Sequence, residues 1–204
     1  MLGKGEQPLE KVIEEAQGSI LQKMEEVNAM RAAAAESEAE AISEIAVAIA
    51  GRLERGGKLI TFGNGGSATD ANDLVADCVA PPSGFRSIPA VSLSAEPANI
   101  TAVANDIGPE AIFARQLIAH ARPEDVAVGF STSGGSANIL AALAEARKRG
   151  LLTVGIVGYD GGRILGEGLA DHAVVVRSDY IPRIQEIQAS IYHVLRGLLD
   201  WSKM

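Results

Sequence analysis

The sequence predicts a three-layer, doubly wound α/β domain with a five-stranded parallel sheet, preceded by N-terminal helices. Five short apolar runs alternate with stretches of helical spacing, a glycine-rich turn follows the first run, and no proline interrupts residues 9–56. Strands that are apolar throughout are typical of a parallel sheet covered on both faces. The predicted strands are residues 59–62, 90–93, 126–130, 152–157 and 173–176.

The first 56 residues predict two amphipathic helices, because their apolar residues recur at helical intervals among charged ones. Ser37 and Glu40 form a candidate capping box for the second helix, and the alanine run 32–35 marks a break or a bend. The apolar stripe needs a cover, which either a second subunit or the chain's own sheet can provide. We therefore divide the chain into an N-terminal helical extension for oligomerisation, residues 1–56, and a globular domain, residues 57–204, which closes with a helix over residues 182–201.

The composition excludes several classes of protein. The chain has 204 residues, 47% of them hydrophobic, enough for one substantial core, and its net charge of −8 disfavours a general nucleic-acid surface. The single cysteine, Cys78, excludes an intrachain disulfide framework. No signal peptide is visible, and no apolar run reaches the ~20 residues that span a bilayer. We expect a cytoplasmic protein that binds neither membranes nor nucleic acid directly.

Two polar turns follow predicted strands and are candidate anion cradles. The first is Gly63-Asn64-Gly65-Gly66, which leads into a helix from Ser67. The second, residues 131–136, holds four hydroxyls and two glycines; a hydrophilic turn with Ser136 as helix cap is the alternative. A dinucleotide fold is disfavoured, because no acidic residue lies about 20 residues beyond the first loop, and no lysine follows its glycines as in a Walker loop.

The helix after the first loop carries three carboxylates, and a later helix carries the most interesting histidine. Asp70, Asp73 and Asp77 are spaced one turn apart, so they form either a solvated face or a general base and metal ligands. His193 lies eight residues after Gln185 on the last helix. Taken alone, this histidine fits a satisfied core residue better than a functional one.

The motifs GNGGSA, AVANDIG, STSGGSAN and RIQEI, in this order, resemble those of the sugar-isomerase (SIS) family, and within it the phosphoheptose isomerases. The resemblance covers nearly the whole chain. It implies a single SIS phosphosugar-binding domain, a homotetramer built through the terminal helices, and conversion of sedoheptulose 7-phosphate to D-glycero-D-manno-heptose 7-phosphate. By motif position, it assigns substrate binding to Asn64, Gly65, Gly66, Ser67, Asp106, Ser131, Thr132, Ser133, Ser136 and Gln185.

The resemblance also implies a catalytic pair and a metal site. Asp77 is the expected base and His193 the expected acid, and the expected metal ligands, for zinc by family resemblance, are Asp73, Asp77, Gln185 and His193. This chain departs from the family pattern twice, since Asp73 replaces a histidine and Asp77 replaces a glutamate. With one imidazole instead of two, the donor set is harder and less selective for zinc.

We therefore expect a ketose–aldose isomerase that acts through a cis-enediol, with a divalent metal but no nucleotide cofactor. Two alternatives remain at this stage. One is a non-catalytic SIS protein that senses phosphosugars or serves as a scaffold for a partner such as a replication initiator. The other is an isomerase for a different sugar phosphate.

Overall fold

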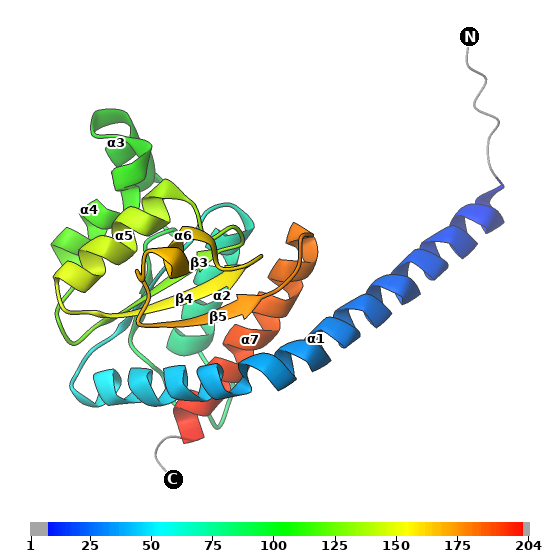
Figure 1. Ribbon diagram of the computed structural model, residues 1–204, viewed down its shortest axis with the longest axis horizontal. Helices are drawn as coiled ribbons and strands as arrows, with labels where there is room; N and C mark the ends of the chain where they lie inside the picture. Colours follow the sequence, from blue (N-terminus) through cyan, green and yellow to red (C-terminus); the bar gives the residue numbers. More distant parts are fainter. Residues whose placement is uncertain (1–7, 202–204) are drawn as a thin grey trace.

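A computed structural model describes residues 8–201 as a long N-terminal helix followed by an α/β body (Figure 1). All five strands are parallel, and their order across the sheet is β2-β1-β3-β4-β5. The predicted fold class is confirmed, and every predicted strand is present with its ends shifted by no more than one residue. In chain order the elements are α1 Leu9–Glu54, β1 Leu59–Phe62, α2 Gly66–Val79, β2 Ala90–Ser92, α3 Pro97–Asp106, η1 Pro109–Ala111, α4 Ile112–His120, β3 Val126–Ser131, α5 Ala137–Lys148, β4 Leu152–Gly158, α6 Gly162–Gly166, β5 His172–Val176 and α7 Ile181–Trp201.

Alternate side chains of each strand enter two separate hydrophobic clusters, one on each face of the sheet. Leu59 and Val128 point to the face covered by α1, α2 and α7, whereas Ile60 and Phe62 point to the face covered by α4 and α5. Because neighbouring parallel strands run in register, every strand-to-helix loop emerges at the same edge of the sheet. The two predicted anion loops therefore lie at one edge.

The prediction of two N-terminal helices is wrong, because α1 is one continuous helix of 46 residues. Its alanine run 32–35 continues the helix, as expected from the high helix propensity of alanine. The predicted capping box is also wrong. Ser37 lies inside the helix, and its hydroxyl donates to the carboxylate of Glu38, 3.2 Å away.

The two halves of α1 have different surroundings. In the second half, Ile42, Ile45 and Ile49 are buried against the sheet, and the Glu38 carboxylate accepts a hydrogen bond from the backbone of Val175 on the edge strand β5. The first half projects away from the body as an arm with exposed apolar residues (Figure 1). We call residues 9–26 the α1 arm; its exposed apolar side chains are Leu9, Val12, Ile13, Ile20, Leu21 and Met24.

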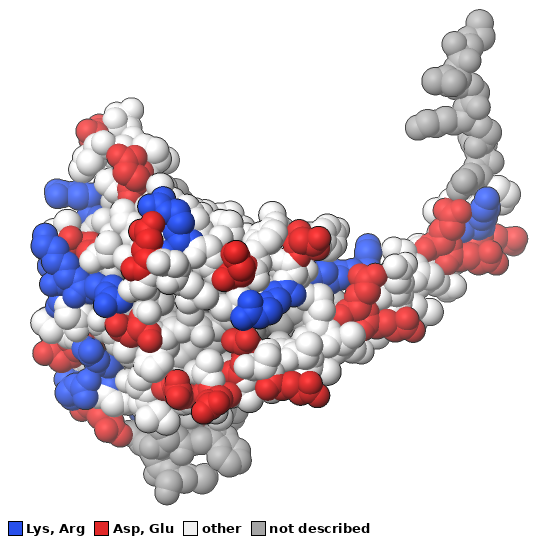
Figure 2. Space-filling model, in the orientation of Figure 1, with Lys and Arg blue, Asp and Glu red and all other residues white. Residues whose placement is uncertain are grey.

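Acidic side chains outnumber basic ones along the α1 arm, and side chains of both signs are scattered over the visible face of the body (Figure 2). Within residues 8–201, none of the helices combines the length and the apolar character that crossing a bilayer requires.

Candidate functional site

The loop after β1 and the loop after β3 are joined by a pair of asparagines. The amide nitrogen of Asn64 donates to the amide oxygen of Asn138, and the amide nitrogen of Asn138 donates back to Asn64, both at 2.9 Å. Asn64 belongs to the loop after β1, and Asn138 lies in the first turn of α5, directly after the loop that follows β3. This exchange holds the two predicted anion loops side by side.

The loop after β1 is packed against the start of α2 and supported by a third strand-end loop. The hydroxyl of Ser94, just after β2, accepts a hydrogen bond from the backbone nitrogen of Gly63 and donates one to its carbonyl oxygen. Ser67 is buried in the first turn of α2. Sequence reasoning missed Ser94, although a hydroxyl at the end of a strand is the kind of signal that identified the other two loops.

In the loop after β3, two hydroxyls fold back onto the loop's own backbone. Ser131 accepts a hydrogen bond from the nitrogen of Gly134 at 3.1 Å, and Ser133 accepts one from the nitrogen of Gly135 at 3.2 Å. A hydroxyl that accepts through a lone pair retains its proton for donation to a ligand. Ser136 occupies the N-cap position of α5, but its side chain makes no capping hydrogen bond. That hydroxyl, too, is available for a ligand.

Helices α2 and α7 run side by side, and Gln185 lies at the start of this interface. A methyl group added at Gly66 would overlap the side-chain amide of Gln185, so this amide lies directly against the first residue of α2. Further along, the guanidinium of Arg196 donates to the backbone carbonyl of Asp77 at 3.0 Å. The two helices are thus fixed to each other near both ends of the shared interface.

Asp77 and His193 meet near the far end of the same interface. The imidazole nitrogen Nε2 of His193 lies 3.4 Å from a carboxylate oxygen of Asp77, and both side chains are partly exposed to solvent. They line a pocket of about 220 Å³ together with Phe85 and Arg196. The ring of Tyr192 lies 4.5 Å from the imidazole ring, centroid to centroid. A carboxylate beside an imidazole is a suitable pair for moving protons.

Between the two ends of the interface lies a buried acidic residue. Burial, with a smaller contribution from the charge of Asp73, raises the pKa of Asp70 to about 6. One of its carboxylate oxygens is buried without a hydrogen-bond partner among the described residues. Burial, followed by the charges of Asp70, Asp73 and Asp77, also raises the pKa of Tyr192 above its ordinary value. Burial therefore makes ionisation of both side chains less favourable than it is in water.

Comparison with known proteins identifies the family. The SIS domain model matches residues 24–158, which is well over half of the chain. The chain belongs to the SIS domain family. The matched segment contains both anion loops and the acidic helix α2, so it covers the greater part of the candidate site.

The proteins similar to this chain include phosphoheptose isomerases. A phosphoheptose isomerase of Nitratiruptor sp. is 47% identical over 146 residues, which cover 71% of this SIS chain and 77% of the relative. One of Solidesulfovibrio magneticus is 43% identical over 87% of this chain and 86% of the relative. The structure of a phosphoheptose isomerase from Francisella tularensis superposes with a TM-score of 0.85 at 30% identity, over 91% of this chain and 98% of that structure. The structure of the phosphoheptose isomerase from Neisseria gonorrhoeae superposes with a TM-score of 0.84 at 29% identity, over 91% of this chain and 99% of that structure.

Within one SIS chain the candidate residues fall into two groups rather than one. Ser67 and Asp77 are ten residues apart on α2, which corresponds to about 15 Å along the helix. The hydroxyl loops and Gln185 lie at one end, and Asp77 and His193 lie at the other. Asp106 belongs to neither group by any described contact, since it is exposed at the end of α3, where it accepts a hydrogen bond from Asn105.

The four expected metal ligands do not assemble within one chain. Across residues 8–201, no three His, Cys, Asp or Glu side chains converge as a metal site. The side-chain amide of Gln185 lies against Gly66, whereas the imidazole of His193 lies beside Asp77, eleven positions or about 16 Å further along α2. The donors of a single chain therefore do not fit a zinc ion bound by all four.

Proposed function

We propose that this protein is a phosphosugar isomerase that converts sedoheptulose 7-phosphate to D-glycero-D-manno-heptose 7-phosphate. The named relatives support the substrate, and the doublet of hydrogen bonds between Asn64 and Asn138 is the structural observation that carries the proposal. It joins two loops rich in glycine and hydroxyls at the carboxyl edge of a parallel sheet, where ligands of such folds bind.

The phosphate is proposed to bind between these loops. Hydroxyl donors and backbone N–H groups near the start of a helix suit an anion, and the positive end of the α2 dipole adds to the attraction. Because the chain is acidic overall, this local geometry rather than net charge has to hold the phosphate. The proposed contacts are Asn64, Gly65, Gly66, Ser67, Ser131, Thr132, Ser133 and Ser136, with Gln185 and Asp106 toward the sugar.

Asp77 and His193 are proposed to move the protons. Asp77 takes a proton from C1 of the ketose while protonated His193 donates one to the C2 oxygen, which gives the cis-enediol. Asp77 then returns its proton to C2, and His193 recovers one from the O1 hydroxyl, which completes the aldose. The 3.4 Å contact between the two side chains supports this division of roles, because it places acid and base beside one reacting centre.

We also propose that each site is shared between copies in a homotetramer. Ser67 and Asp77 of one chain lie roughly 15 Å apart along α2, and a heptose phosphate spans roughly 10 Å from its reacting carbons to phosphorus, so one chain reaches both ends of the substrate only when the sugar is extended between them. A loop from one copy and the Asp77–His193 pair from another remove that restriction. The uncovered α1 arm supports this, because its exposed apolar side chains need a partner surface.

A metal held by Asp73, Asp77, Gln185 and His193 likewise requires ligands from two copies. When bound, such an ion supplies Lewis-acid polarisation of the carbonyl. The proton transfers described above use only the chain's own side chains. We assign the reaction to the cytoplasm, in line with the buried and unpaired Cys78.

Incubation of the purified protein with sedoheptulose 7-phosphate tests the proposal. We expect the aldose product by NMR, and exchange of solvent deuterium into C2 of that product. Parallel reactions with a chelator and with added Zn²⁺ or Mn²⁺ measure the metal requirement. Tight binding of the sugar phosphate without turnover under every metal condition would instead establish a phosphosugar sensor.

A further inference from the structure

The turn between β4 and α6 packs directly against the proposed phosphate loop. We call residues 158–162 the brace turn and residues 131–136 the phosphate loop. We propose that Asp160 is a positioning residue that holds the phosphate loop in its binding conformation through the brace turn. The phosphate role of that loop is part of the proposed function, on which this inference rests.

The two segments touch through backbone, with almost no space between them. A methyl group at Gly134 of the phosphate loop would overlap the carbonyl oxygen of Gly161, and one at Gly162 would overlap the carbonyl oxygen of Ser133. Gly134 and Gly162 both have positive φ angles, 60° and 52°, which only glycine adopts at low cost. A change in the brace turn is therefore transmitted directly to the phosphate loop.

A hydrogen bond also crosses between the segments. The backbone nitrogen of Ile164, in α6, donates to the carbonyl oxygen of Gly134 at 3.0 Å. The path of Gly134 matters for ligand binding, because its own nitrogen donates to the hydroxyl of Ser131 at 3.1 Å. The orientation of one proposed phosphate contact thus depends on the position of α6 and of the turn before it.

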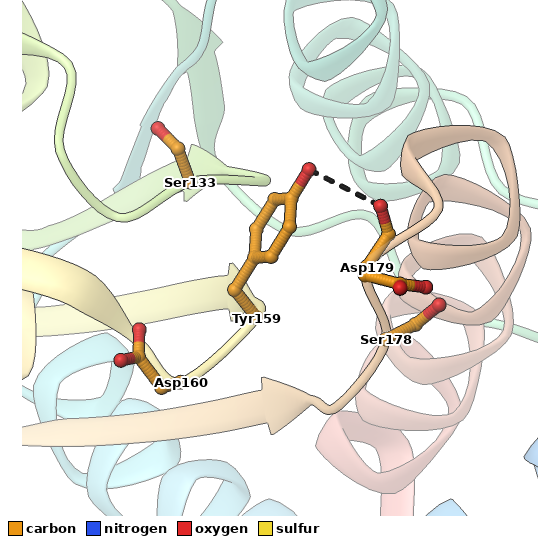
Figure 3. Close-up of a pocket in the computed structure, with 5 residues that line it drawn as sticks. All are labelled: Ser133, Tyr159, Asp160, Ser178 and Asp179. Carbon is orange, nitrogen blue, oxygen red and sulfur yellow. Dashed lines mark hydrogen bonds between the residues drawn. The ribbon is translucent and has the colours of Figure 1, made fainter.

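Asp160 fixes the shape of the brace turn. One of its carboxylate oxygens accepts a hydrogen bond from the backbone nitrogen of Gly162 at 3.0 Å. The residue before it, Tyr159, has a φ angle of 53°, an unfavourable value for a tyrosine that needs support from its surroundings. The hydroxyl of Tyr159 donates to the backbone carbonyl of Asp179 at 3.4 Å (Figure 3).

Tyr159 and Asp160 line an open cavity of about 590 Å³ together with Ser133, Ser178 and Asp179, and the Tyr159 ring lies between Ser133 and Asp179 (Figure 3). Asp160 is exposed, so its removal leaves both hydrophobic clusters intact. Its carboxylate bears the same charge sign as a phosphate and so repels it. Loss of the charge alone would strengthen phosphate binding, whereas loss of the brace would weaken it, and the two effects have opposite signs.

The test compares Asp160→Ala with Asp160→Asn, which retains the accepting oxygen without the charge, and with Asp179→Ala. Asp179→Ala removes a second carboxylate from the same cavity, and no hydrogen bond to this carboxylate is described. The variant keeps the backbone carbonyl of Asp179, which accepts the hydrogen bond from Tyr159. The full-length proteins are titrated with inorganic phosphate by calorimetry. We expect the Kd to rise about three- to ten-fold in Asp160→Ala, as for one lost hydrogen bond, and to stay within about two-fold or fall in the other two variants.

A second readout needs no ligand. Amide hydrogen exchange over residues 132–136 is expected to speed up in Asp160→Ala and to stay at the parent rate in Asp160→Asn. If Asp160→Ala does not fold, Asp160→Ser takes its place, because a serine hydroxyl makes this type of turn more weakly and should give an intermediate Kd. Equal affinities of the Ser and Asn variants would then contradict the proposal.

The inference is overturned if Asp160→Ala binds phosphate as tightly as the parent, if Asp160→Asn is as weak as Asp160→Ala, or if the parent binds no phosphate. Failure of the proposed function is a separate result, because absence of turnover with sedoheptulose 7-phosphate leaves the comparison of phosphate affinities and exchange rates unchanged.

Discussion

Asn64 and Asn138 lie 74 positions apart in the sequence, yet their side-chain amides form a closed pair of hydrogen bonds, each 2.9 Å long. Asn64 is exposed and Asn138 is half-buried at the sheet edge, and both lie outside the hydrophobic clusters. Such a pair does little for the stability of the core. Its effect is to fix the separation of two loops, and that separation determines whether both can contact one phosphate.

Asn138→Ala is expected to raise the KM for sedoheptulose 7-phosphate by about ten-fold, because both hydrogen bonds to Asn64 are lost and the loops separate. The kcat should change much less, since Asn138 lies far from Asp77 and His193. Steady-state kinetics measure both quantities. Asn99→Ala, at an exposed position on α3, serves as the control. An unchanged KM in Asn138→Ala would show that the loops do not need this link.

Asp77→Asn and His193→Gln are each expected to lower kcat by about 10²- to 10⁴-fold, the usual contribution of a general acid or base. Inorganic phosphate should bind both variants as it binds the parent, because the pair lies at the other end of α2 from the phosphate loop. The control is His120→Gln, at the exposed end of α4. Weak phosphate binding by the His193 variant would contradict the separation of the two groups.

Mixed oligomers test whether copies share sites. Ser133→Asp, which places a negative charge in the phosphate loop, and His193→Gln should each be inactive alone. If every site takes its loop from one copy and its pair from another, a random equal mixture should regain about a quarter of the parent activity. Co-expression with two affinity tags provides the mixed species. No recovery in verified mixed oligomers would place each site within a single chain.

Gly66→Ala is expected to displace the Gln185 side chain at little cost in stability, because the overlapping atoms belong to the end of a flexible side chain. If Gln185 binds the sugar, Gly66→Ala and Gln185→Ala should raise KM by similar factors. The double variant should then be no worse than either single variant. Kinetics and thermal melts of all four proteins complete the cycle. Additive effects on KM would mean that Gly66 acts independently of Gln185.

Asp70→Asn is expected to stabilise the protein at neutral pH but not in acid. Burial raises the pKa of Asp70 from 3.8 to about 6, so the unfolded chain binds fewer protons than the folded one within this window. The stability contribution of Asp70 therefore falls as pH rises from about 4 to about 6. The variant lacks this penalty and should gain about 1–2 kcal/mol at pH 7.5 and little at pH 4.

Urea unfolding between pH 4 and pH 8 measures this difference. Asp106→Asn, at an exposed aspartate, is the control for stability. A gain in Asp70→Asn that does not vary with pH would assign the effect to something other than ionisation of the buried carboxyl.

The sequence alone was sufficient for the strands and for the two hydroxyl loops. Both depend on local signals, namely uninterrupted apolar runs for buried parallel strands and glycine with hydroxyls where a strand gives way to a helix. Local signals misled at α1 and at His193, whose apolar neighbours suggested a core residue although its side chain is exposed. The alanine run 32–35 was compatible with a break, and the helix continues because nothing in that run opposes it and its second half gains burial against the sheet.

Only the tertiary structure decided which of these residues meet. Asn138 was visible within its motif, but its partnership with Asn64 depends on the order of the strands, which places β1 beside β3. The support from Asp160 and the hydroxyl of Ser94 likewise come from neighbouring strand ends. The family resemblance assigned Gln185 and His193 to one metal site, whereas the parallel packing of α2 and α7 holds them at opposite ends of an interface. Spacing along a chain records which face of a helix a side chain occupies; contacts between elements depend on packing that no local pattern contains.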